Sequence, residues 1–328
     1  GVDEFVENEI GKAKKFYIKN AKVIGITAHI RPDGDAIGST LGMYLYLKKR
    51  LPGSDIKVYL DPVDDSFSMM PAVADIISSP DESKVFDAFI IIDCDRERTG
   101  DYRVMADRAV TVINIDHHIS NKDGSGDINY VVPHASSASE LVFNTMDKEY
   151  IDSDIASLLY MGIAHDTGVF RFNNTKPDTL RCVADLLEYE FDASNILDVT
   201  FFEKTLKQNK IQGEIVLASR LYCDGRLIVG VATEDIIEKY AATKYDFDGV
   251  VNQLLLTKGV ETAIFMYPKS EGVYKLSLRS CTDTVDVSAI TMKIGGGGHV
   301  RAAGADFTGT WQEAEKTLVD MISPIFNK

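Results

Sequence analysis

Residues 110–118 read VTVINIDHH, an apolar run that leads directly into an Asp-His-His triplet. Three further apolar runs also end in acidic clusters, which are HIRPDGD at 29–35, DCD at 93–95 and DTG at 166–168. A short buried strand that ends in a metal-binding side chain, repeated along a chain, is typical of a parallel sheet with its site at the carboxyl edge. The four clusters together predict an α/β fold with one polynuclear metal site.

The donor set of these clusters indicates which metal they bind. Imidazole with several carboxylates, and no thiolate except Cys94, favours a hard or borderline cation such as Mn²⁺ over structural zinc. The carboxylates exceed what one cation needs. In two-metal hydrolases the ions lie about 3.5 to 4 Å apart and lower the pKa of a bridging water, which attacks phosphorus. We therefore expect two Mn²⁺ ions, with Mg²⁺ or Co²⁺ as substitutes, and phosphoester hydrolysis.

Each cluster also has a simpler interpretation. Asp-Gly-Asp after a proline, as at 32–35, ordinarily forms a turn. Paired histidines are often surface or core residues without a further role. The joint occurrence of four clusters in this order favours the site. Asp95 is interpreted as a helix cap rather than a ligand. His165 is interpreted as a residue that supports either the site or the fold without binding metal.

The clusters resemble, in order and spacing, the motifs of the DHH phosphoesterase superfamily: HIRPDGDAIGS (29–39), DCD (93–95), DHH (116–118) and DTGVF (166–170). A second group resembles the glycine-rich DHH-associated domain of the first type: SLRS (277–280), VDVS (285–288), GGGGH (295–299) and AAG (302–304). The resemblance covers nearly the whole chain. This pairing is typical of the branch that degrades very short oligonucleotides (nanoRNA) and removes a phosphate from 3′-phosphoadenosine 5′-phosphate (pAp).

Carried over by position, the resemblance implies ligands for two metals. One metal would take His29, Asp33 and Asp93. The other would take Asp35, Asp93, His117 and Asp166, which makes Asp93 the bridge. His118 would lie beside the scissile phosphate as a hydrogen-bond donor, and Asp116 would orient the imidazoles.

The glycine run at 295–298 has two interpretations. Four consecutive glycines are compatible with a flexible linker. The apolar segment before them and the small residues after them favour a close-packed loop, in which the N–H groups of Gly297 and Gly298 meet a phosphate. By resemblance, Arg279 and His299 would bind the phosphate or terminal nucleotide of the substrate. Ser280 and Arg301 are weaker candidates for the same role.

Composition limits the substrate. With 35 basic and 50 acidic residues the formal charge is −15. A long nucleic-acid groove requires many cationic contacts to phosphates, so this balance argues against one and against RecJ-like processive exonucleases. The expected partners are therefore short oligonucleotides or mononucleotides, which a few cationic groups can neutralise.

Localisation and assembly are less constrained. The cysteines lack a CxxC pair, which is typical of reduced thiols; they are Cys94, Cys182, Cys223 and Cys281. Neither an apolar signal segment nor a stretch of about 20 apolar residues is evident. We expect a cytoplasmic protein without a membrane partner. The oligomeric state is open, and a homodimer is one option.

Periodicity predicts the order of the elements. An amphipathic helix is expected over Phe5–Ala21, followed by strands at 23–28, 56–60, 88–92 and 110–115. Helices are expected at 36–49, 136–149, 152–164 and 176–190. A second, mixed sheet is expected from strands at 227–233, 261–268 and 272–280, with a closing helix at 311–325.

These elements predict how the chain divides into domains and which function each domain has. Residues 1–190 would form the metal-binding catalytic domain, 191–214 a helical connector and 215–328 a smaller α/β substrate-binding domain, with a cleft between the domains. The leading function is metal-dependent hydrolysis of nanoRNA and pAp. A phosphodiesterase of linear or cyclic dinucleotides is the nearest alternative. A non-catalytic nucleotide sensor is an alternative from a different class.

Overall fold

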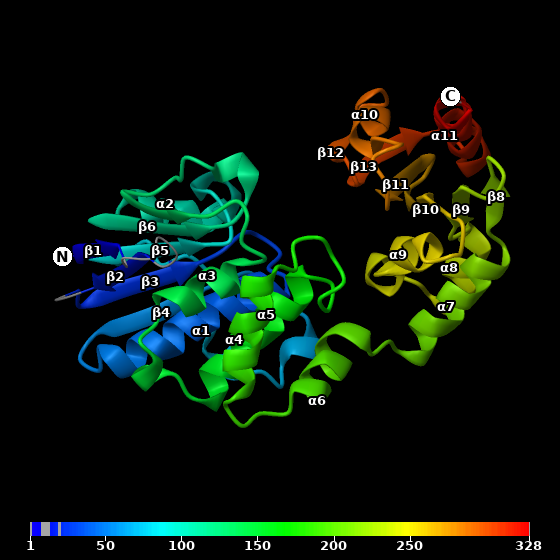
Figure 1. The fold of residues 1–328 in the computed structure, drawn as a ribbon. Coiled ribbons are helices and arrows are strands. Elements are labelled where there is room, and N and C mark those ends of the chain that lie inside the picture. Colours follow the sequence, from blue (N-terminus) through cyan, green and yellow to red (C-terminus); the bar gives the residue numbers. More distant parts are fainter. Residues whose placement is uncertain (1, 8–13, 19–20, 328) are drawn as a thin grey trace. The chain divides into compact units, whose positions relative to one another are not determined.

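The computed structural model describes residues 2–7, 14–18 and 21–327. The chain divides into two compact units, Gly1–Glu203 and Lys204–Lys328, and each unit has its own sheet and core (Figure 1). The boundary falls inside the segment 191–214 that we interpreted as a connector. Within the described ranges, no helix is long and apolar enough to cross a membrane.

A parallel sheet with the strand order β4-β3-β5-β6-β7 forms the centre of the first unit. Its strands are β3 (Val23–Thr27), β4 (Asp55–Tyr59), β5 (Ala88–Ile92), β6 (Thr111–Asp116) and β7 (Ile128–Val131). The four predicted strands are confirmed. Their continuous apolar runs reflect burial on both faces of the sheet. Strand β7 was not predicted, because its four residues are mostly half-buried and lack such a run.

Helices cover both faces of this sheet (Figure 1). The predicted helices are confirmed with different ends, as α1 (Gly34–Arg50), α3 (Ala138–Thr145), α4 (Ser153–Asp166) and α5 (Pro177–Leu187). Residues of α1, α3 and α4 pack on Ile90 and Ile92 of β5. On the other face, α2 (Arg103–Asp107) packs on Phe89 and Ile91. This alternation along β5 follows from the two-residue period of a strand.

Glycines set the close approach of α1 to α4. A Cβ atom added to Gly38 would lie 2.3 Å from the carbonyl oxygen of Leu158. One added to Gly162 would lie 1.9 Å from Ser139 Oγ and 2.9 Å from Asp35 Oδ1. Because no side chain fits at these crossings, the helices pack backbone to backbone.

Short turns join the elements of the first unit, which also contains α6 (Ala193–Leu197). They are η1 (Asp65–Phe67), η2 (Val73–Asp75), η3 (Arg96–Tyr102), η4 (Ile119–Asn121), η5 (Lys148–Tyr150) and the π-turn η6 (Asp198–Phe202). Asp95 caps η3, since its Oδ1 accepts a hydrogen bond of 3.0 Å from Arg98 N, which confirms the predicted cap.

The N-terminal helix predicted over Phe5–Ala21 is wrong for the residues that the structure describes. Val2–Glu7 (β1) and Lys14–Ile18 (β2) are strands that pair antiparallel. Both segments contain Val, Phe, Tyr or Ile, which favour strands when a partner strand is available. The 3.6-residue pattern was therefore misleading. Residues 8–13, 19 and 20 of the predicted helix lie outside the described ranges.

The second unit contains a mixed sheet with the order β12-β13-β11-β10-β9-β8. Its strands are β8 (Arg220–Tyr222), β9 (Leu227–Val231), β10 (Thr262–Ser270), β11 (Val273–Ser280), β12 (Gly297–His299) and β13 (Ala302–Thr308). The three predicted strands are confirmed as β9, β10 and β11. Strands β12 and β13 replace the loop expected around the glycine run.

Helices again lie on both faces (Figure 1). They are α7 (Leu206–Leu217), α8 (Glu234–Tyr240), η7 (Lys244–Phe247), α9 (Val250–Leu255), α10 (Val287–Met292) and α11 (Trp311–Phe326). The closing helix is thus confirmed as α11. Helices α10 and α11 pack over β11 and β13, whereas α7, α8 and α9 pack on the opposite face over β9 and β10.

Candidate metal centre

The carboxyl edge of the parallel sheet brings the acidic clusters together. His29 follows β3, Asp93 follows β5 and His117 follows β6, as expected for strand ends. Asp35 lies in the first turn of α1. Asp166 is the last residue of helix α4, which agrees with the helix predicted at 152–164 and not with the strand end expected from the acidic clusters. The apolar run before Asp166 continues a buried helix, which a short apolar stretch does not distinguish from a strand.

Three groups of potential metal ligands form at this edge, and in each the donor atoms lie within 4.8 Å of one another. They are His29, Asp33 and Asp93; Asp35, His117 and Asp166; and Asp93, His117 and His118. The structure thus brings together every residue that the resemblance assigned to a metal. His118 joins them, although we expected it to contact the phosphate.

Asp93 lies between the two histidine positions. Its Oδ1 is 3.2 Å from His117 Nε2, and its Oδ2 is 3.5 Å from His29 Nε2. The residue is buried and has a φ of +66°. A non-glycine residue in this left-handed region is strained, and such strain is found where function requires a fixed geometry. Each carboxylate oxygen of Asp93 therefore faces a different ligand group.

The imidazoles are oriented for cation binding. His29 Nδ1 donates a hydrogen bond of 2.9 Å to the carbonyl of Ile30, so in the neutral ring, the form that binds a metal, Nε2 carries the lone pair, and this atom faces carboxylates. Neither His117 Nε2 nor Asp93 Oδ1 has a hydrogen-bond partner among the described residues, although both atoms are buried. Buried polar atoms are normally paired. These residues therefore fit divalent metal ions, which would satisfy both atoms.

The electrostatics of the cluster also favour added positive charge. Burial works against a charged His117, but Asp93, Asp35 and Asp166 outweigh it and raise its pKa to about 10. Burial opposes charge on His29 as well, yet Asp33 and Asp93 raise its pKa to about 10. Burial, with repulsion from Asp93 and Asp33, raises the pKa of Asp166 to about 7 despite His117.

Backbone N–H groups hold two of the carboxylates. Asp35 is buried, and its oxygens accept hydrogen bonds of 2.7 Å from Ala138 N and 2.9 Å from Ser139 N, in the first turn of α3. Asp33 caps α1 with Oδ1, which leaves Oδ2 facing His29 Nε2 at 3.7 Å. Helix N-termini stabilise negative charge, so both acids stay in place while oxygen atoms remain for a cation.

Asp116 organises the histidine pair through a network that the sequence analysis missed. Its Oδ1 accepts hydrogen bonds from His118 Nδ1 at 2.7 Å and from His117 N at 2.8 Å, so it orients the ring of His118 rather than both rings. Asn121 Nδ2 donates to Asp116 Oδ2 and to Asn114 Oδ1. Burial alone would raise the pKa of Asp116, but the hydrogen bonds from His118 and Asn121 outweigh burial, so the pKa lies below its usual value. The polar Asn114 within the apolar run VTVINI was the available signal.

Asn174 is a second residue that the sequence did not reveal. Its Nδ2 donates hydrogen bonds of 3.0 Å to the carbonyls of Asp166 and Ser136. It thereby joins the end of α4 to the loop before α3, whose N–H groups hold Asp35. Nothing in the stretch FNNT distinguishes this amide from an ordinary turn residue.

Two of the substrate-binding candidates, Arg279 and His299, lie on one face of the second sheet. Arg279 on β11 pairs in register with Ala302 on β13, which pairs with His299 on β12. Directly paired residues share a face, so the small Ala302 lies between the two larger side chains. Arg279 is half-buried and has no ion pair with a carboxylate among the described residues. A cation in that situation suits an anionic ligand.

The remaining candidates differ in availability. Ser280 is buried, and its hydroxyl donates a hydrogen bond of 2.8 Å to the carbonyl of Thr282. Arg301 is exposed and forms an ion pair with Asp283 at 3.0 Å. Gly297 pairs with Gly304 in the sheet, and a Cβ added to Gly298 would lie 2.5 Å from Ala302 O. The glycines thus allow β12 to pack closely on β13.

Comparison with known proteins agrees with both units. The DHH family N-terminal domain matches residues 23–163, and the DHHA1 domain matches residues 224–328. The chain is 32% identical over 288 residues to the bifunctional oligoribonuclease and PAP phosphatase NrnA of Thermus thermophilus, covering 87% of this chain and 84% of that protein. It is 29% identical over 301 residues to NrnA of Bacillus subtilis, covering 89% and 91%.

Among solved structures, an exopolyphosphatase-related protein from Bacteroides fragilis superposes with a TM-score of 0.84. It is 26% identical, and the match covers 94% of this chain and 95% of that one. The motifs, the sheet order and the buried His and Asp cluster agree with these matches. The chain therefore belongs to the DHH family of phosphoesterases and carries a DHHA1 domain after its DHH domain.

Proposed function

We propose that this phosphoesterase hydrolyses very short oligonucleotides and removes a phosphate from pAp. The observation that carries the proposal is Asp93, whose two oxygens face different histidines in two adjoining ligand groups. The relatives named NrnA support the choice of substrates, since they match both units of the chain. A bound pair of divalent cations would stabilise charge on the phosphoryl oxygens and activate water.

We assign the residues as follows. His29, Asp33 and Asp93 would hold one ion, and Asp35, Asp93, His117 and Asp166 would hold the other. His118 donates to the phosphate, which requires protons on both ring nitrogens, because Nδ1 already donates to Asp116. Mn²⁺ is the proposed ion, because the donors are carboxylates and imidazoles, and Mg²⁺ or Co²⁺ would substitute.

In the second unit, Arg279 and His299 bind the terminal phosphate or nucleotide of the substrate. Arg279 offers a planar fork of N–H donors, and the small residues beside it leave space on the sheet for a ligand. Gly297 and Gly298 offer backbone N–H groups, and Ser280 and Arg301 are secondary candidates. Ser280 and Arg301 already have partners within the chain, which makes them less available.

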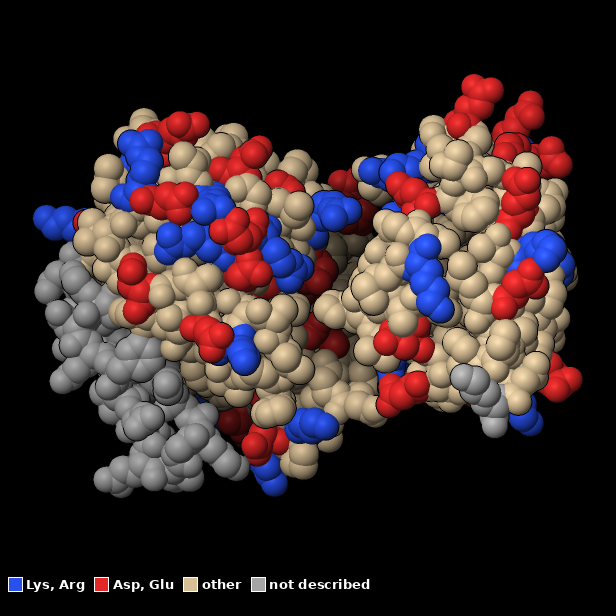
Figure 2. Space-filling view, turned by 90° about the horizontal axis from the view of Figure 1, so that it is seen from above, with Lys and Arg blue, Asp and Glu red and all other residues tan. Residues whose placement is uncertain are grey.

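Surface charge supports a short substrate. On the face drawn in Figure 2, the basic side chains of the first unit are mixed with acidic ones and form no continuous stripe. The formal charge of the chain is −15. Added phosphates therefore meet an acidic surface, and catalytic efficiency should fall as the oligonucleotide lengthens.

A substrate panel tests the proposal. With Mn²⁺ present, kcat/KM is measured for di- to pentanucleotides, an oligonucleotide of tens of residues, pAp and a cyclic dinucleotide. We expect dinucleotides and pAp to be the best substrates, with a shallow dependence on salt, since few counterions are released. A preference for long oligonucleotides with a steep salt dependence would contradict the proposal. Preferred cleavage of the cyclic dinucleotide would favour the alternative phosphodiesterase, and binding without turnover would indicate a sensor.

A further inference from the structure

His165 contacts three segments of the first unit. Its ring lies against Gly34, where an added Cβ would be 2.3 Å from His165 Cγ. The ring centroids of Phe67 in η1 and Phe201 in η6 lie 5.5 and 5.1 Å from that of His165. Only glycine fits at position 34 while the imidazole is there. His165 therefore packs directly on the first residue of α1, between the proposed metal ligands at 33 and 35.

The hydrogen bonding of His165 fixes its tautomer. Thr200 Oγ1 lies 2.7 Å from the carbonyl of Ile196, which only accepts, so the hydroxyl proton is directed there. His165 Nε2 is 2.9 Å from the same oxygen and must therefore be the donor. A neutral ring then carries its proton on Nε2, as the hydrogen bond at one nitrogen determines. The bond is directional and joins α4 to η6.

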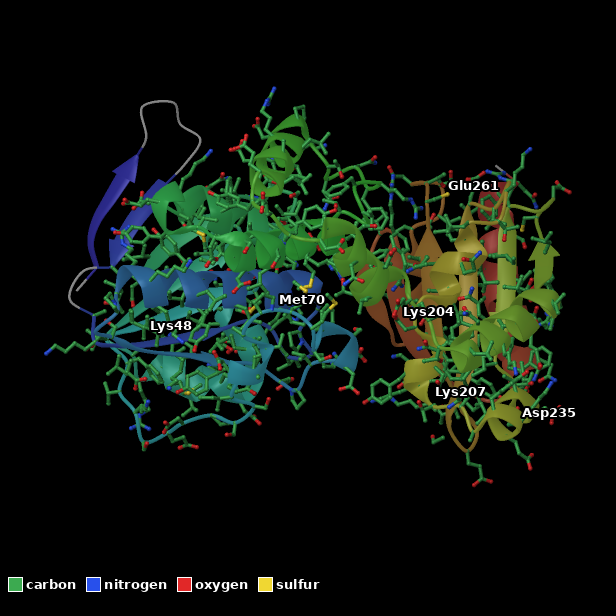
Figure 3. The ribbon with its side chains drawn as sticks, turned by 90° about the horizontal axis from the view of Figure 1, so that it is seen from below. Lys48, Met70, Lys204, Lys207, Asp235 and Glu261 are labelled. Carbon is green, nitrogen blue, oxygen red and sulfur yellow. The ribbon has the colours of Figure 1, made fainter. Side chains whose placement is uncertain are left out.

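Thr200 lies where the chain leaves the first unit. Glu203 N donates a hydrogen bond of 2.7 Å to Asp198 O, which closes the π-turn, and π-turns are common at functional sites. Lys204 begins the second unit, and Figure 3 labels it together with Lys207. Within the second unit, Lys204 contacts Asp248 and Lys207 contacts Asp246. Few residues thus separate the bond to His165 from the first ion pairs of the second unit.

We propose that His165 is a positioning residue, which ties the exit segment at 198–202 to the N-terminus of α1, where Asp33 and Asp35 lie. The proposal rests on the proposed function, because it assumes that the second unit binds the substrate that the metal centre hydrolyses. The tie holds the exit segment at a fixed place relative to these ligands. Its loss leaves the metal ligands intact but weakens productive substrate binding.

Matched substitutions isolate the hydrogen bond. His165→Gln places an amide nitrogen near the position of Nε2, whereas His165→Asn places one only near Nδ1. Thr200→Ser keeps the hydroxyl, whereas Thr200→Val removes it at similar volume. We expect His165→Asn and Thr200→Val to raise KM for a ribodinucleotide about three- to tenfold, which is the range of one net hydrogen bond. Their kcat and Mn²⁺ content should stay near those of the wild type, as should all values for the Gln and Ser variants.

A second readout needs no catalysis. Amide hydrogen exchange of the peptide covering 198–203 should be faster in the Asn and Val variants and unchanged in the Gln and Ser variants. If the wild type does not hydrolyse the dinucleotide, the proposed function fails, while the exchange measurement still decides the role of His165. If His165→Asn does not fold, the Thr200 pair tests the same bond from its other side.

Two results would overturn the proposal. One is unchanged exchange at 198–203 in both the Asn and the Val variant. The other is a loss of kcat and of Mn²⁺ content at constant KM, which would place the action of His165 on the metal ligands alone.

Discussion

The candidate sites of the two units differ in the charge of their side chains and in how crowded those side chains are. In the first, carboxylates from several elements crowd around Asp93, and histidines and backbone N–H groups hold them there. In the second, the half-buried Arg279 lies beside Ala302 on an open part of the sheet. The first arrangement favours a bound cation and the second a bound anion. Neither unit alone offers both, which is why we propose that hydrolysis of nucleotides requires the whole chain.

The largest expected effect is that of Asp93→Ala. It removes an oxygen from both ligand groups, so turnover with Mn²⁺ should fall at least about 10³-fold. The control is Asp95→Asn, which is two residues away and preserves a capping oxygen for η3. Rates on a dinucleotide and Mn²⁺ content would be measured for both variants. Retention of more than about a tenth of the wild-type rate by Asp93→Ala would contradict the bridging role.

His118→Ala should differ in kind from Asp93→Ala. As a donor to the phosphate, His118 should contribute about 10²- to 10³-fold in kcat, while Mn²⁺ content stays near normal. Elemental analysis of the purified variant, together with steady-state rates, checks this. Loss of one equivalent of metal would instead make His118 a ligand, which its place in the group with Asp93 and His117 allows.

Gly38→Ala tests the packing that brings Asp35 and Asp166 together. The added methyl would meet the Leu158 carbonyl, so α1 and α4 must separate, at a cost of about 1 to 3 kcal/mol in unfolding free energy. Gly213→Ala is the matched control in α7 of the second unit, where nothing lies within 4 Å of an added Cβ. It should be neutral or stabilising by up to about 1 kcal/mol. Similar stabilisation of both variants would show that helix propensity, and not the crossing, dominates.

Arg279→Lys is expected to have the smallest effect. The charge remains but the planar fork is lost, so kcat/KM should fall about tenfold, mainly through KM. Arg301→Lys is the control, because Arg301 already pairs with Asp283. A larger loss of kcat/KM in Arg301→Lys than in Arg279→Lys would indicate that Arg301, and not Arg279, binds the substrate.

Sequence alone predicted the parts of the molecule that depend on local pattern. The strand before His117 and the clusters at the sheet edge were readable, because a buried parallel strand is apolar throughout. The hydrogen bond from Ala138 N to Asp35 could not be predicted, since it joins residues about a hundred positions apart. The hydrogen bond from Asn174 to the carbonyl of Asp166 could not be predicted either. The prediction of an N-terminal helix failed for the same reason. Pairing between β1 and β2 decides the structure of this segment, and the periodicity of its apolar residues does not reveal that pairing.

The register across the second sheet was hidden in a similar way. The resemblance named Arg279 and His299, but not that Ala302 would lie between them on one face. That neighbourhood follows from strand pairing, which the glycine run obscured because glycine has weak strand propensity.

The crowding of carboxylates around Asp93 also has a thermal consequence. Ligands that bind only the folded state stabilise it by mass action, by about 2.7 kcal/mol for one site at a hundred times its dissociation constant. Mn²⁺ should therefore raise the melting temperature of the first unit and leave the second unchanged. Calorimetry with increasing Mn²⁺, starting from the chelated protein, should then show one transition that rises in temperature and one that stays constant. The balance of stability between the two units would thus depend on the supply of metal in the solution.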